Sequence, residues 1–268
     1  SLAGTILRRH PVNTQNLFSL QGRSALITGG SRGIGRMIAA GFLAQGARVY
    51  ISARKTEACD QAAAELSALG PCVSLPADVS TNEGIRRLVS SYLAHEPALD
   101  ILVNNAGAAW GAPFDEFPEA GWDKVVDLNL KSPFFLTQAL IGSLRAAASP
   151  ARPAKVIHIA SIDGISVNPM ETYSYAASKA GLIQLTRRMA LRLAQDHIVC
   201  SAIAPGAFAS EMNREARDHA EEIAARIPAG RIGQDEDMAG AAIFLASRAG
   251  DYVLGSTLVV DGGVTNAR

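Results

Sequence analysis

Short apolar runs recur along the chain, and longer segments of helical character lie between them. The runs are nearly continuous rather than alternating in polarity, which is typical of strands that are covered on both faces. They predict strands at residues 24–28, 48–53, 72–77, 101–104, 155–160, 198–204 and 256–260. The segments between them predict helices at residues 34–45, 56–69, 82–96, 121–148, 173–195 and 235–247.

This alternation of strand and helix predicts an α/β fold. We expect a single-domain, Rossmann-like, doubly wound parallel sheet of about seven strands with helices on both faces. No linker or repeat divides the pattern, so residues 23–268 are expected to form one domain and residues 1–22 an N-terminal extension. Two segments interrupt the alternation: a proline-bearing loop at 148–154, and a long charged stretch at 207–230 of the kind that often covers a site.

Composition and charge exclude several classes of partner. Lys and Arg together number 25, as do Asp and Glu, so the net charge is zero and no overall field attracts nucleic acid. No apolar run reaches the length of a membrane span, so we expect no membrane partner. The three cysteines are scattered and odd in number, which argues against a disulfide framework and favours a cytoplasmic protein. The spacing of His and Cys fits no metal site, so no metal is predicted.

A glycine-rich turn, TGGSRGIG at residues 28–35, joins the first predicted strand to the first helix. Glycines let the backbone approach a pyrophosphate closely, and the helix N-terminus offers free N–H groups. Taken alone, an ordinary turn explains the glycines equally well. Polar or glycine residues also follow the later strands, however, and the carboxyl ends of parallel strands meet at one edge. These residues are Asp78, Asn104 to Gly107, Ser161, and Pro205 with Gly206.

The end of the second strand indicates which nucleotide binds. A free ribose 2′-hydroxyl usually meets a carboxylate there, whereas a 2′-phosphate requires cations. The chain has no acidic residue at Ser52 or Ala53, but offers Arg54 and Lys55, and Arg32 lies within the glycine turn. Because the arginine fork suits phosphate oxygens, these cations favour NADP(H).

Tyr175 and Lys179 are four residues apart at the start of a predicted helix and therefore share a face. A nearby ammonium favours phenolate, so we expect Lys179 to lower the pKa of Tyr175 and make it a usable acid or base. Ser161 ends the preceding strand, in a position to hydrogen-bond a substrate oxygen. The alternative is a surface Tyr–Lys pair. Tyr173 is a rival phenol, but its spacing from Lys179 puts it on another face.

In this order, these motifs resemble the short-chain dehydrogenase/reductase family. The resemblance rests on the TGxxxGxG turn, the NNAG run at 104–107, Asn129, Ser161, the YxxxK pair at 175 and 179, and the PG pair at 205–206. It extends from about residue 20 to the DGG at 261–263 and thus covers nearly the whole chain.

The resemblance implies a role for each of these residues. Tyr175 would donate a proton to a carbonyl oxygen, Lys179 would bind the nicotinamide ribose, and Ser161 would orient the carbonyl. Asn129 would support a water-linked proton path to Lys179, although a buried Asn capping a helix break is an alternative. Together with the cations above, the predicted cofactor-binding residues are Gly29, Ser31, Arg32, Gly33, Ile34, Gly35, Arg54, Asp78, Val79, Asn105, Ala106, Gly107, Tyr175, Lys179, Pro205, Gly206 and Ser210.

Within the family, segments 178–182, 227–233 and 255–263 look most like those of 3-oxoacyl (β-ketoacyl) reductases. Residues 105–111 and the N-terminal extension further resemble members linked to rhamnolipid synthesis. This implies NADPH-dependent reduction of a β-ketoacyl thioester of coenzyme A or acyl carrier protein. An NADP-dependent sugar, polyol or steroid dehydrogenase is a second hypothesis, and a non-catalytic NADPH-binding regulator is a third.

The resemblance also bears on partners. Arg152 fits one of the cations with which carrier-dependent reductases meet an acidic carrier protein, but the second position falls on Leu191, with Arg192 beside it. Whether the acyl group is carried by acyl carrier protein or by coenzyme A therefore stays undecided. Phe208, Met212 and Ile223 either line an acyl groove or pack in the ordinary way. Family members usually assemble as tetramers through two long helices, so we expect a homotetramer.

Overall fold

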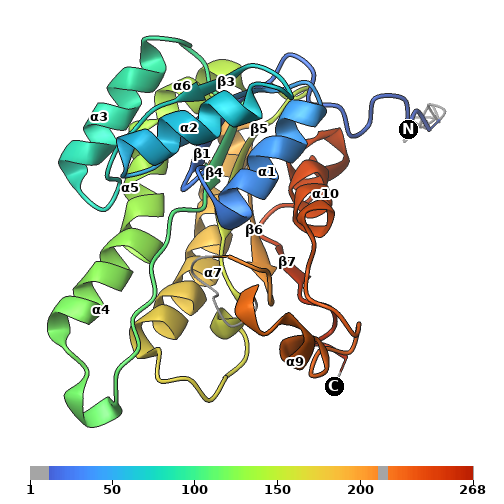
Figure 1. The fold of residues 1–268 in the computed structure, drawn as a ribbon. Helices are drawn as coiled ribbons and strands as arrows, with labels where there is room; N and C mark the ends of the chain where they lie inside the picture. Colours follow the sequence, from blue (N-terminus) through green and yellow to red (C-terminus); the bar gives the residue numbers. More distant parts are fainter. Residues whose placement is uncertain (1–11, 211–216, 268) are drawn as a thin grey trace, which may run out of the picture.

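A seven-stranded parallel sheet lies between two layers of helices in the computed structural model, which describes residues 12–210 and 217–267 (Figure 1). The strand order is β3-β2-β1-β4-β5-β6-β7, and every neighbouring pair is parallel. The strands are β1 (Ser24–Thr28), β2 (Arg48–Ser52), β3 (Cys72–Ser74), β4 (Ile101–Asn104), β5 (Ala154–Ile159), β6 (Ile198–Pro205) and β7 (Thr257–Val260). The predicted doubly wound fold is confirmed.

The helices cover both faces of the sheet. They are α1 (Gly33–Ala44), α2 (Thr56–Leu66), α3 (Asn82–Leu93), α4 (Glu119–Val126), α5 (Ser132–Ala139), α6 (Ile141–Ala147), α7 (Tyr173–Leu193), α9 (Ala220–Ala224) and α10 (Asp235–Ala246). In the described part of the chain, none of them combines the length and apolar character needed to cross a bilayer.

Alternate residues of the inner strands point into two separate hydrophobic cores. In β1, Ala25 and Ile27 face the core shared with α1, α2 and α10, whereas Leu26 faces the core shared with α3, α5, α6 and α7. All three are fully buried. Burial on both faces explains why the strands are continuous apolar runs in the sequence. Core packing begins at Leu20, which is fully buried within the stretch 1–22 and whose N–H donates to the Gln45 carbonyl at 2.9 Å.

Two predicted elements differ from those observed. The strand predicted at 72–77 ends at Ser74, although the N–H groups of Leu75 and Ala77 still donate to the carbonyls of Ile51 and Ala53 beside it. The helix predicted at 121–148 is divided into α4, a π-helical turn at Asp127–Lys131, α5 and α6. The break between α5 and α6 lies at Leu140, whose φ and ψ of −95° and 4° leave the helical region.

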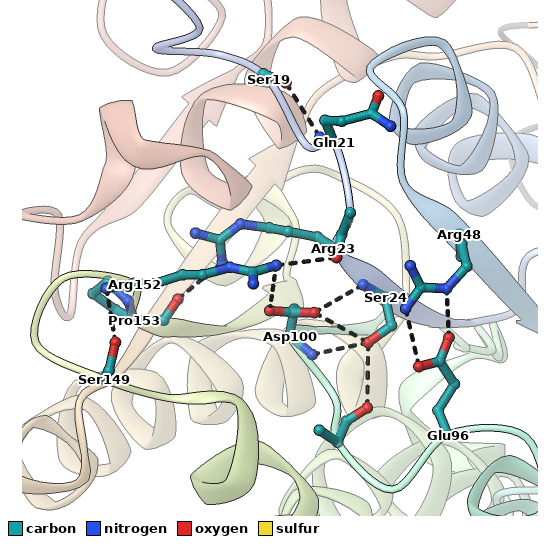
Figure 2. Close-up of polar contacts among 12 residues, drawn as sticks. Ser19, Gln21, Arg23, Ser24, Arg48, Glu96, Asp100, Ser149, Arg152 and Pro153 are labelled. Carbon is teal, nitrogen blue, oxygen red and sulfur yellow. Dashed lines mark hydrogen bonds and ion pairs between the residues drawn. The ribbon is translucent and has the colours of Figure 1, made fainter.

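The amino edge of the sheet carries a network of charged side chains (Figure 2). The Asp100 carboxylate accepts from the Ser24 N–H at 2.9 Å and pairs with Arg152 at 3.1 Å. The buried Arg23 guanidinium donates to the Pro153 carbonyl at 3.0 Å. Nearby, Arg48 forms a two-bond pair with Glu96 at 2.6 and 3.0 Å. These contacts join the starts of β1, β2, β4 and β5, so the cations here serve the fold.

This placement bears on Arg152, the expected carrier-protein contact. Arg152 precedes β5 and therefore lies at the edge opposite the carboxyl ends of the strands. Besides its pair with Asp100, it donates to the Gly22 carbonyl at 3.1 Å. Arg152 thus has structural partners of its own.

Candidate active site

The glycine-rich turn follows β1 at the carboxyl edge and has no room for side chains. Gly29 and Gly33 have φ values of 66° and 52°, a region that strains other residues. A Cβ at Gly35 would collide with the Gly29 carbonyl oxygen, and one at Gly30 would lie 2.7 Å from the Ile51 side chain. The glycines are therefore required by the close approach of the turn to α1 and β2.

The start of α1 is open to an anion. Its N-cap residue, Arg32, makes no side-chain capping bond, and its first turn holds no acidic residue. A cavity of about 310 Å³ adjoins it, lined by Arg32, Gly33 and Ser210 among others. Free N–H groups at a helix N-terminus beside an arginine suit a phosphate. The residues present fit the predicted dinucleotide. Ser210 lies next to Gly33, and its contact with a cofactor stays a prediction.

Two of the predicted phosphate-binding cations are exposed and available. Arg32 and Arg54 both face solvent, and neither forms an ion pair with the described residues. Arg54 stands two residues past the end of β2, next to β1 in the sheet. This arrangement leaves both guanidinium groups free to meet a phosphate at the carboxyl edge.

The turn after β4 is tied to the glycine turn. The Asn105 side-chain amide donates to the carbonyls of Thr28 and Gly29 at 2.9 and 3.1 Å. The N–H groups of Asn105 and Ala106 both donate to the Thr28 hydroxyl at 3.0 Å. The Asn105 side chain thus holds the two turns together, and any contact of this segment with a ligand falls to its backbone and to Gly107.

Asp78 and Val79 follow β3 along the same edge. One Asp78 carboxylate oxygen accepts from the N–H and the hydroxyl of Ser80, at 3.1 and 2.7 Å. The other oxygen accepts no hydrogen bond from the described residues, so it stays available to a ligand. Val79 is buried. Pro205 ends β6, and Gly206 continues along β7 by donating its N–H to the Val260 carbonyl at 2.9 Å.

Asn129 lies in the π-helical turn and is buried. Its side-chain oxygen accepts from the Ala108 N–H at 2.8 Å, and its amide donates to the Ala108 carbonyl at 2.9 Å and to the Ser178 hydroxyl at 3.1 Å. Ser178 in turn donates to the Tyr175 carbonyl at 2.8 Å. The side chain therefore links the β4 turn to α7, and a path to Lys179 remains a proposal.

Ser178 is a positioning residue that the sequence interpretation missed. Its spacing could have indicated this role, because Ser178 lies three residues after Tyr175 and directly before Lys179 on the same helix.

Ser161, Tyr175 and Lys179 meet at the carboxyl edge. Ser161 is buried at the end of β5, and its hydroxyl accepts from the Asp163 N–H at 3.1 Å. The Lys179 ammonium lies 5.6 Å from the centre of the Tyr175 ring and donates to the Ile159 carbonyl at 2.7 Å. A Cβ at Gly107 would be 3.7 Å from the same ammonium, so the β4 turn borders it too. Tyr173, the rival phenol, points instead to Glu171 at 2.9 Å.

The prediction that Lys179 lowers the pKa of Tyr175 is wrong for this chain. Burial raises the pKa of Tyr175 to about 12, and its hydrogen bond with Ser161 opposes that rise only in part. Burial also lowers the pKa of Lys179 to about 8. Desolvation disfavours the charged form of each group. Tyr175 is consequently protonated at neutral pH, the state that a proton donor needs.

His158 is a fully buried residue of β5 next to this group. Its Nδ1 lies 2.9 Å from the Thr186 hydroxyl, which already donates to the Leu182 carbonyl, so Nδ1 carries the proton. Its Nε2 has no hydrogen-bond partner among the described residues. Burial, with a smaller contribution from Lys179, lowers the pKa of His158 to about 3.

We expect His158 to destabilise the fold in acid. The unfolded chain takes up a proton near pH 6.5, while the folded imidazole stays neutral down to about 3. The free energy of unfolding should therefore fall by about 1.4 kcal/mol per pH unit across this window from this residue. His158→Gln should flatten that slope, measured by urea unfolding at several pH values. The exposed His219 is the control: His219→Gln should keep the wild-type slope, and an unchanged slope in His158→Gln would contradict the assignment.

Of the three possible acyl-groove residues, the structure describes Phe208 and Ile223. Phe208 is 2% exposed and belongs to the core with α1 and α10, so it lines no open groove. Ile223 is half-buried in α9. Met212 lies outside the described residues.

Comparison with known proteins finds similar proteins over most of the chain. The family model described as enoyl-(acyl carrier protein) reductase matches residues 29–265. The rhamnolipids biosynthesis 3-oxoacyl-[acyl-carrier-protein] reductase of Pseudomonas aeruginosa is 49% identical over 92% of this chain and 97% of its own length. A solved structure from the same organism, an RhlG/NADP active-site complex, has a TM-score of 0.91 at 48% identity and covers 93% of this chain and 99% of that one.

Enzymes that act on sugar acids are similar to this chain at lower sequence identity. The 2-dehydro-3-deoxy-D-gluconate 5-dehydrogenase of Dickeya dadantii is 39% identical over 92% of this chain and 97% of its own length. The family model covers most of the chain, and these relatives align over nearly all of it. This chain has the glycine turn and the Ser161, Tyr175 and Lys179 group at one edge of its sheet. The chain belongs to the short-chain dehydrogenase/reductase family.

Proposed function

We propose that this protein is an NADPH-dependent reductase of β-ketoacyl thioesters, producing 3-hydroxyacyl groups for lipid or rhamnolipid precursors. The observation that carries the proposal is the meeting of Ser161, Tyr175 and Lys179 beside the glycine turn at one edge of the sheet. The name of the Pseudomonas relative supports the same substrate class.

NADP(H) is the proposed cofactor. The N–H groups at the start of α1 would hold its pyrophosphate, and Arg32 and Arg54 would hold its 2′-phosphate. Asp78 and Val79 would contact the adenine, and Pro205, Gly206 and Ser210 the nicotinamide side. When bound, the nicotinamide supplies a hydride for the reduction. The NADP complex of the similar Pseudomonas structure supports this choice.

The side chains of this chain would supply the proton and the orientation. Tyr175, protonated at neutral pH, would donate its phenolic proton to the oxygen of the 3-oxo group. The Ser161 hydroxyl would hydrogen-bond the same oxygen and stabilise developing charge. Lys179 would hold positive charge beside Tyr175, and Asn129 would keep the β4 turn and α7 in register through Ala108 and Ser178.

The surface around the site favours an acyl group over a polyol. The segment between Ser161 and Tyr175 exposes Ile165, Val167 and Met170, and the segment after β4 exposes Phe114. A polyol is recognised chiefly by hydrogen-bonding side chains, whereas an alkyl chain gains from apolar contact. The sugar-acid dehydrogenase relative keeps a polyol substrate as the second candidate.

The test is to follow NADPH absorbance in the presence of 3-oxoacyl thioesters of coenzyme A and of acyl carrier protein. NADPH consumption with either is expected, and the ratio of kcat/KM between them identifies the carrier. Preferential oxidation of a polyol with NADP+ would establish the second candidate instead.

We also propose that the protein is a homotetramer. A groove of about 390 Å³ between α5, α6 and α7 is lined by the apolar side chains of Phe134, Ile141, Leu185, Met189 and Leu193, together with Thr137, Gln138, Arg145, Arg188 and Arg192. A matching face on a second copy would cover these side chains, as expected of a symmetric contact. Sedimentation velocity should show a species of four chains, and a monomer at micromolar concentration would contradict the assignment.

A further inference from the structure

Glu171 joins two segments that are far apart in the sequence and that border the proposed active site. One is the segment of residues 112–117, which follows β4. The other is the end of the loop between Ser161 and α7. Glu171 lies at the end of this loop, four residues before Tyr175.

The contacts at Glu171 come from both its side chain and its backbone. Its carboxylate oxygen Oε1 accepts from the Phe114 N–H at 3.2 Å and from the Tyr173 hydroxyl at 2.9 Å. Its carbonyl accepts from the Ala112 N–H at 3.2 Å. Hydrogen bonds to a carboxylate are stronger than those between neutral groups. The hydrogen bond to Glu171 raises the pKa of Tyr173, so this phenol stays a donor.

Ring packing completes the junction. The Tyr173 ring contacts Phe114 edge-on with centres 5.5 Å apart, and contacts Phe117 in the same way at 5.7 Å. Phe114 is nevertheless 73% exposed, so burial contributes little to holding its segment. The Glu171 bonds are therefore the main polar restraint on residues 112–114.

The junction borders the reacting groups at two points. Tyr173 is in the first turn of α7, two residues before Tyr175. The segment 112–117 begins four residues after Ala108, which Asn129 holds from the other side. Asn129 and Glu171 thus fix the two ends of the stretch from 108 to 114 that passes the site.

We propose that Glu171 is a positioning residue for the acyl part of the substrate. It fixes the aromatic segment 112–117 against the start of α7, so that this segment forms a stable wall beside Tyr175. The inference rests on the proposed reduction of β-ketoacyl thioesters. Loss of the Glu171 carboxylate should therefore weaken binding of a longer acyl chain, which reaches the wall, more than that of a short one.

The kinetic test compares Glu171→Ala and Glu171→Gln with wild type, using a four-carbon and a ten-carbon 3-oxoacyl coenzyme A thioester. For Glu171→Ala we expect a KM increase of about tenfold for the longer substrate, with kcat and the KM of the shorter one nearly unchanged. Glu171→Gln keeps the acceptor oxygen and should restore most of the wild-type KM. Glu119→Ala is the matched control, since the exposed Glu119 carboxylate lies just after this segment and bonds to no described residue.

A second measurement separates the junction from the proposed function. Hydrogen exchange of the Phe114 amide, which donates to the Glu171 carboxylate, should be faster in Glu171→Ala than in wild type, whatever the substrate. The Ala112 amide donates to the Glu171 backbone carbonyl, which the substitution keeps, and should change less. If wild type reduced no 3-oxoacyl thioester while this exchange still increased, the proposed function would fail and the junction would stand. If Glu171→Ala does not fold, Tyr173→Phe, which loses one of the bonds, should show a smaller change in the same direction. Wild-type exchange and KM values in the folded variants would overturn the proposal.

Discussion

Tyr175→Phe is expected to lower kcat for thioester reduction by about 1,000-fold while leaving NADPH binding within a few-fold of wild type. The substitution removes only the phenolic oxygen, which is the proposed proton donor, and positioned general acids contribute on this scale. The ring contacts are kept, so the fold should persist. Because burial raises the pKa of Tyr175 to about 12, the phenol of the wild-type enzyme carries its proton at neutral pH.

Stopped-flow or steady-state absorbance of NADPH measures the loss, and thermal unfolding of the same sample checks the fold. Tyr173→Phe is the natural control for the loss of a phenol on the same helix turn, and we expect its kcat to stay close to that of wild type. A Tyr175→Phe enzyme that keeps more than a tenth of the wild-type kcat would remove Tyr175 from the mechanism and return attention to Ser161.

Reversing the charge of Arg54 should weaken NADPH binding by about 100-fold, with much less effect on NADH. Arg54→Asp removes a charge-assisted hydrogen bond to a phosphate and places a carboxylate near it, which together account for this scale. NADH has a hydroxyl in place of that phosphate, and a carboxylate accepts a hydrogen bond from it. Since Arg54 is exposed and forms no ion pair with the described residues, the change should not disturb the fold.

Fluorescence titration of both nucleotides at one fixed ionic strength measures this shift in preference, because salt screens exposed charges. Arg87→Asp makes the same charge change on the exposed face of α3 and should leave both affinities unaltered. Equal losses for NADPH and NADH in Arg54→Asp would show that Arg54 does not read the 2′-phosphate.

The sequence pattern predicted the layout of the sheet well because the inner strands β1, β2, β4, β5 and β6 are buried on both faces. Leu26 and its neighbours in β1 lie in two different cores, so every position of the run is apolar. The apolar pattern did not show the division of the long helix at Asp127–Lys131, which was anticipated only by the alternative role of Asn129 as a buried Asn at a helix break. That π-helical turn accompanies the bonds between Asn129 and the backbone of Ala108, a contact across 21 residues that no local pattern encodes.

The site shows the same contrast between local and distant information. The spacing of Tyr175 and Lys179 placed both on one face of α7, and the order of the strands brought Ser161 to them. The direction of the pKa shift at Tyr175 depends on burial by surrounding segments, which spacing does not reveal. For the same reason the sequence could not decide whether Phe208 lines a groove or packs in the core. In the structure its ring is enclosed by residues from other elements.

The charge network at the amino edge has a consequence for how this protein can change. Asp100, Arg23 and Glu96 secure the starts of the strands, whereas the groups proposed to meet cofactor and substrate all follow the strand ends. Folding and selectivity therefore draw on separate sets of side chains. Residues 112–117 and 165–171, which the Glu171 contacts join, can therefore be exchanged together for those of a related enzyme at little cost to the scaffold. Such modularity makes the chain a suitable starting point for directed evolution towards new carbonyl substrates.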